Sequence, residues 1–67
     1  MSAQLLRQEI RSLINNIDGQ LARVQDRAED AGIPPFYLQD QHGDYIMIPL
    51  LLAKANALLA LTNLEKK

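Results

Sequence analysis

Apolar residues recur with a four-three spacing along the first half of the chain. The row consists of Ile10, Ile14, Ile17, Leu21, Val24, Ala28 and Ala31. This spacing places side chains on one face of an α-helix and is typical of helices that pack along a narrow apolar stripe. Leu6 and Leu13 widen the stripe, and Ser2 is a suitable N-cap. The pattern predicts one long helix over residues 3–31.

Glycines decide whether that helix is continuous and where it ends. Asp18-Gly19 is a turn signal and would divide the helix. The four-three spacing continues through this point without slipping, and Gly19 falls opposite the apolar row, so we favour a continuous helix. Gly32 is expected to end it, and Pro34-Pro35 prevents its continuation.

The segment 36–48 has the composition of a β-hairpin. Aromatic and β-branched residues flank a polar stretch that contains Gly43. An isolated hairpin is barely stable in water, so this one would lie on the helices or pair with another subunit. The sequence leaves these two arrangements open.

A second helix is expected over residues 49–64. Pro49 suits its first position, and the residues that follow are apolar almost all round. A helix of this kind is buried on most sides, which a short chain cannot achieve alone. The apolar stretch 46–61 contains Pro49, Lys54 and Asn56 and is judged too short to span a membrane.

The small size of the chain favours assembly. A chain of 67 residues buries only roughly 60% of its unfolded surface. Small domains add disulfides, a structural metal or further subunits, and here there is no cysteine and a single histidine. Oligomerisation remains, and 48% hydrophobic residues supply the surface for it.

The unequal helix lengths suggest where a second subunit binds. The first helix would be roughly 43 Å long and the second roughly 24 Å, so the second covers only part of the first. The N-terminal half of the first helix is then left without a partner from its own chain. The expected oligomer interface consists of Leu6, Ile10, Leu13, Ile14, Ile17, Leu21, Leu51 and Leu58.

Residues that could carry chemistry are few. Asp40, His42 and Asp44 alternate in one short segment, but polar residues are the usual composition of a solvated turn. Lys54 lies among leucines, and such a lysine more often extends outward to solvent or pairs with a carboxylate at a subunit contact than acts as a base. We therefore expect no catalytic residue, no metal and no cofactor.

Two sets of residues could contact partners. Phe36, Tyr37 and Tyr45 either dock another protein or supply the bulky part of a small core. Arginines at i and i+4 could contact phosphates, namely Arg7, Arg11, Arg23 and Arg27. The two pairs point to opposite sides of the helix and the net charge is −1, which disfavours a nucleic-acid partner.

The expected fold class is mainly α, with a minor β element: a long helix, a β-hairpin and a short helix in one domain over residues 1–67. This helical hairpin would assemble as a dimer with a four-helix-type bundle. The expected function is a non-enzymatic homo-oligomeric protein-protein interaction module, such as a small adaptor. The alternative is a small helical nucleic-acid-binding regulator. The N-terminal residues lack the features of a signal peptide, so we expect a cytoplasmic protein without a membrane partner.

Overall fold

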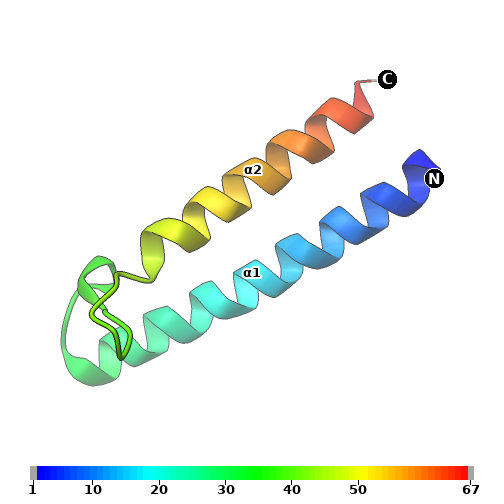
Figure 1. The fold of residues 1–67 in the computed structure, drawn as a ribbon. Helices are drawn as coiled ribbons and strands as arrows, with labels where there is room; N and C mark the ends of the chain where they lie inside the picture. Colours follow the sequence, from blue (N-terminus) through cyan, green and yellow to red (C-terminus); the bar gives the residue numbers. More distant parts are fainter. Residues whose placement is uncertain (1, 67) are drawn as a thin grey trace.

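The computed structural model describes residues 2–66 as a hairpin of two helices. Helix α1 spans Ala3–Ala31, a short 3₁₀ turn η1 spans Pro35–Tyr37, and helix α2 spans Met47–Glu65 and runs back beside α1 (Figure 1). The molecule is elongated and measures 44 × 18 × 15 Å. The mainly helical fold class is confirmed. A single chain does not test the expected dimeric bundle.

Helix α1 is continuous and is capped at both ends. The Ser2 hydroxyl oxygen accepts a hydrogen bond from the Leu5 amide, 3.2 Å away. At the other end Gly32 has a positive φ of 70°, and the amides of Gly32 and Ile33 donate to the carbonyls of Glu29 and Ala28. These two bonds form a Schellman motif, which satisfies carbonyls that the helix leaves free. The helix therefore covers the predicted residues, and Gly19 does not interrupt it.

The predicted β-hairpin over residues 36–48 is wrong. Its first arm is the turn Pro35–Tyr37, because Pro34 and Pro35 restrict φ to values that suit a 3₁₀ turn. Its second arm joins α2, which begins at Met47. Within the described residues, the pairing that remains is one isolated antiparallel bridge between Gln39 and Tyr45.

Helix α2 is longer than the sequence indicates. It begins two residues before Pro49, which occupies the third position, where the missing amide hydrogen has no partner in the helix in any case. The helix has 19 residues, and an 18-residue window within it has a mean hydropathy of 1.5, so by length and composition it could cross a membrane. The expectation that this segment is too short for a span is therefore wrong. Core helices of soluble assemblies share these two properties, so they do not identify a membrane protein.

The helices pack through one row of residues from each. In α2 the row is Met47, Leu50, Lys54, Ala57, Leu61 and Leu64, all buried or half-buried. We call it the inner row of α2. In α1 the corresponding inner row is Ile10, Ile14, Ile17, Leu21, Val24 and Ala28. Both rows keep the four-three spacing, which suits packing along a shared stripe.

The best-buried cluster lies at the loop end of the hairpin. It joins Val24 and Ala28 of α1 to Met47 of α2 and to Leu38 from the loop. Leu21, Ile46 and Leu50 pack against it. Leu38 thus closes the end of the hairpin, which is why a loop without regular strands is held in place.

Among the described residues, two ion pairs join the helices along one side. Lys54 Nζ lies 2.7 Å from Asp18 Oδ1, and Arg11 contacts Glu65 at 3.1 Å. The second pair shows that α2 extends almost to the beginning of α1. Because α2 reaches this far, Leu6 and Ile10 are half-buried. The expected lack of intrachain partners in the N-terminal half of α1 is therefore corrected for Leu6 and Ile10, whereas Leu5 and Leu13 remain exposed.

Candidate interaction surface

The main exposed apolar surface lies on the side of α2 that faces away from its inner row. Five large side chains there are 39% to 61% exposed, with Leu59 the most exposed. We call this surface the outer stripe of α2: Ile48, Leu51, Leu52, Ala55, Leu58, Leu59 and Thr62. Its members recur at three and four residues, so they share one side of the helix.

No member of the outer stripe is charged, and its one hydroxyl group already donates a hydrogen bond within the helix. The one polar member is Thr62, whose hydroxyl donates to the Leu58 carbonyl at 2.9 Å. Burial of this surface would leave no donor unsatisfied, because the helix itself supplies the acceptor. The stripe is therefore suited to contact with another apolar surface.

The total exposed surface is larger than that of a compact monomer. A folded protein of 7.5 kDa is expected to expose about 4,250 Å². This chain exposes 5075 Å². The excess of about 800 Å² equals what one subunit buries in a standard interface.

The structure divides the residues expected at the oligomer interface into two groups. Ile10, Ile14, Ile17 and Leu21 belong to the inner row of α1, and Ile17 is only 4% exposed. Leu6 is half-buried near the same end. The exposed members are Leu13 on α1 and Leu51 and Leu58 on α2. Sequence reasoning found an apolar helix at 49–64 but could not tell its two sides apart.

The aromatic residues lie exposed around the loop. Phe36, Tyr37 and Tyr45 are all more than half exposed. They do not belong to the buried cluster at this end of the hairpin, which consists of Val24, Ala28, Leu38 and Met47. Of the two roles left open by the sequence, the contribution to a small core is therefore the one that their exposure disfavours.

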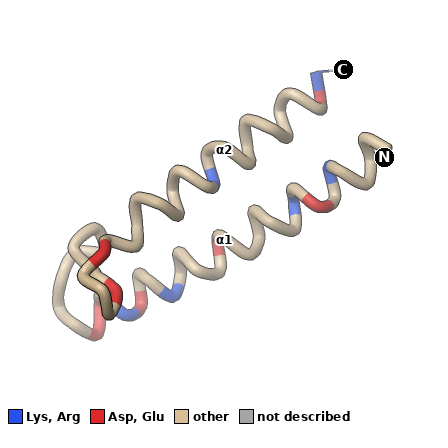
Figure 2. Tube along the Cα trace, in the orientation of Figure 1, with Lys and Arg blue, Asp and Glu red and all other residues tan. Residues whose placement is uncertain are grey.

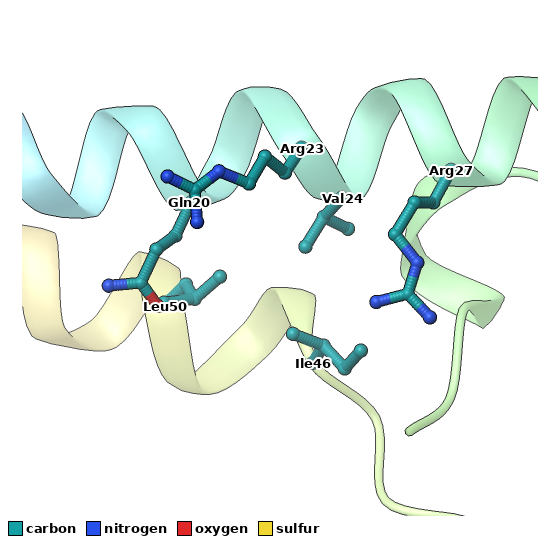
Figure 3. A pocket seen from close by; sticks show the side chains of 6 residues that line it. All are labelled: Gln20, Arg23, Val24, Arg27, Ile46 and Leu50. Carbon is teal, nitrogen blue, oxygen red and sulfur yellow. The ribbon is translucent and has the colours of Figure 1, made fainter. Parts of the chain in front are cut away.

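The four arginines do not form one basic face. Arg11 is paired with Glu65, and Arg7 is half-buried. Figure 2 shows basic and acidic residues interleaved along α1. Arg23 and Arg27 flank a shallow hollow of about 180 Å³, with Val24, Ile46 and Leu50 at its base; Gln20 completes the lining (Figure 3). Arg27 extends toward α2 whereas Arg23 lies along α1.

The polar turn at residues 40–44 is stabilised by hydrogen bonds to the side chain and the carbonyl of Asp40. Asp40 Oδ1 accepts hydrogen bonds from the amides of His42 and Asp44, at 2.8 and 3.0 Å. Gly43 has a φ of 81° and donates to the Asp40 carbonyl. Among the described residues no group of three His, Cys, Asp or Glu side chains could hold a metal ion. The Asp40 carboxylate thus stabilises the turn.

Lys54 is the charged member of the inner row of α2. Its ammonium contacts the Asp18 carboxylate of the same chain, and both side chains remain partly exposed. A hollow of about 290 Å³ near the loop is lined instead by Arg27, Asp40, Gln41 and His42, so Lys54 does not face it. The geometry thus gives the Lys54 ammonium a carboxylate partner across the hairpin.

Compared with known proteins, the chain matches no family model, no curated sequence and no solved structure.

Proposed function

We propose that this chain is a non-enzymatic interaction module that functions as a homo-oligomer. The observation that carries the proposal is the outer stripe of α2, which exposes large apolar side chains along a whole helix. An apolar surface of this extent is typical of a protein-protein contact rather than of a monomer in water. The excess surface of about 800 Å² supports a partner that covers one face.

The second copy is the partner that fits best. A symmetric dimer buries the same patch on both chains, so one uncharged stripe supplies both halves of the interface. Two hairpins joined in this way give an assembly of four helices with the two α2 helices at its centre. The loop aromatics Phe36, Tyr37 and Tyr45 remain free for contact with a different protein, in which tyrosine is often an important residue.

Sedimentation equilibrium over the micromolar range tests this function. We expect a dimer or a larger species, with a thermal midpoint that rises with protein concentration because assembly stabilises the folded state. A folded monomer at all concentrations would overturn the proposal. Flotation with phosphatidylcholine vesicles in place of self-association would also overturn it and would assign the outer stripe to a lipid surface.

A matched pair of variants separates the interface from general stability. Leu52→Glu places a charge in the outer stripe, and Asn56→Glu places one at an exposed polar position of the same helix. We expect the first to dissociate the assembly and the second to leave it intact. Equal effects would contradict the assignment of the stripe as the contact.

A further inference from the structure

The outer stripe of α2 is symmetric about its central residue. Counting from Ala55, stripe members lie three, four and seven positions away in both directions. The positions thus pair as Leu52 with Leu58, Leu51 with Leu59, and Ile48 with Thr62. A stripe with this symmetry matches its own reverse, so it can lie against a second copy running in the opposite direction.

We infer that two copies pack α2 against α2 in antiparallel orientation, with the twofold axis at Ala55. This inference rests on the proposed function and specifies its geometry. At the axis each copy presents only a methyl group, which allows the two backbones to approach closely. On either side Leu51 meets the partner's Leu59, and Leu52 meets the partner's Leu58.

The charge distribution of the hairpin favours the antiparallel orientation. The loop end is rich in acids: Asp26, Glu29, Asp30, Asp40 and Asp44 stand against Arg23 and Arg27. The open end carries Arg7, Arg11 and Lys66 against Glu9 and Glu65. An antiparallel dimer would place the acidic end of one copy beside the more basic end of the other. A parallel dimer would bring two acidic ends together.

The surface area is also consistent with this arrangement. Each copy has an excess of about 800 Å² over a compact monomer, and a standard interface buries about that much on each side. The dimer would leave the polar outer side of α1 in water on both sides of the assembly. It would bury α2 between two neighbours, as its composition requires.

Cysteine cross-linking tests the orientation directly, because the natural chain has no cysteine. Leu51→Cys and Leu59→Cys are prepared separately, distinguished by a mass tag, mixed and oxidised mildly. We expect the mixture to give several-fold more mixed disulfide dimer than either variant gives alone. Leu52→Cys mixed with Leu58→Cys provides an independent pair with the same expectation.

Two further variants complete the experiment. Ala55→Cys lies on the axis and should cross-link with itself, whereas Asn56→Cys lies beside the stripe and should not. Circular dichroism checks that each variant retains the helical content of the natural chain. If Leu51→Cys alone cross-links as well as the mixture does, the dimer is parallel and the inference is wrong.

The failure of this inference can be distinguished from that of the proposed function. A dimer in solution whose Ala55→Cys variant does not cross-link would keep the function and move the interface to another face. A chain that sediments as a monomer and gives no cross-link at any position would overturn both.

Discussion

The two helices have similar inner rows and different outer sides. Both keep a four-three row that packs against the other helix. Outside its inner row α1 exposes two large apolar residues, Leu5 and Leu13, among many charged and amide side chains. Helix α2 exposes five, and its charged residues are Lys54 and Glu65. Helix α1 thus presents a mostly polar surface to water, whereas α2 presents a mostly apolar one.

Disruption of the packing between the two inner rows should have the largest effect, and it acts on the stability of the fold. Val24→Asp buries an unpaired carboxylate at a position only 5% exposed. This costs several kcal/mol, which is comparable with the whole stability of about 3–10 kcal/mol expected for a chain of this length. We expect loss of cooperative thermal unfolding, measured by circular dichroism. Gln25→Asp, at the exposed neighbouring position, should unfold cooperatively; similar losses in both variants would refute the assigned inner row.

Charged substitutions on the two outer sides should then differ in their effect on assembly. Leu58→Glu removes an apolar contact from the outer stripe of α2 and should weaken association by about tenfold to a hundredfold. Leu13→Glu changes an exposed leucine of α1 and should alter association by less than about twofold. Sedimentation equilibrium measures both. If Leu13→Glu weakened association more than Leu58→Glu, the interface would lie on the N-terminal part of α1, as the sequence suggests.

The smallest effects on stability are expected at two glycines, Gly19 within α1 and Gly32 at its C-terminal cap. Gly19 has open space around it, so Gly19→Ala should stabilise the helix by about 0.5–1 kcal/mol. Gly32 has a φ of 70°, so Gly32→Ala should destabilise the fold by about 1 kcal/mol. Each change should shift the thermal midpoint by about 4–8 °C per kcal/mol, in opposite directions. Shifts of the same sign would show that one of these backbone assignments is wrong.

The sequence predicted α1 because its signals are local. The apolar spacing, Ser2 and Gly32 all act within a few residues of the structure that they determine. The segment 36–48 was predicted incorrectly because its composition suits strands, whereas tertiary contacts decide its conformation. Leu38 and Met47 enter the buried cluster, and this burial outweighs the strand preference of their neighbours.

The candidate interface could be predicted only in part. The apolar character of residues 49–64 led us to expect a partner, but a helix that is apolar all round does not reveal which side faces its own chain. Lys54 made this harder, since a lysine usually marks an outer side and here belongs to the inner row. Its contact with Asp18 is made across the hairpin and has no signature in the nearby sequence.

The position of the buried cluster has a consequence for the order of folding. Val24 and Met47 meet at the loop end, whereas Arg11 and Glu65 meet at the open end, 54 residues apart in the chain. Closing a short segment loses less chain entropy than closing a long one, and each contact formed shortens the segment that the next must close. The two helices are therefore expected to join first beside the loop and to zip toward the termini, so that the open end is the last part to form and the first to fray.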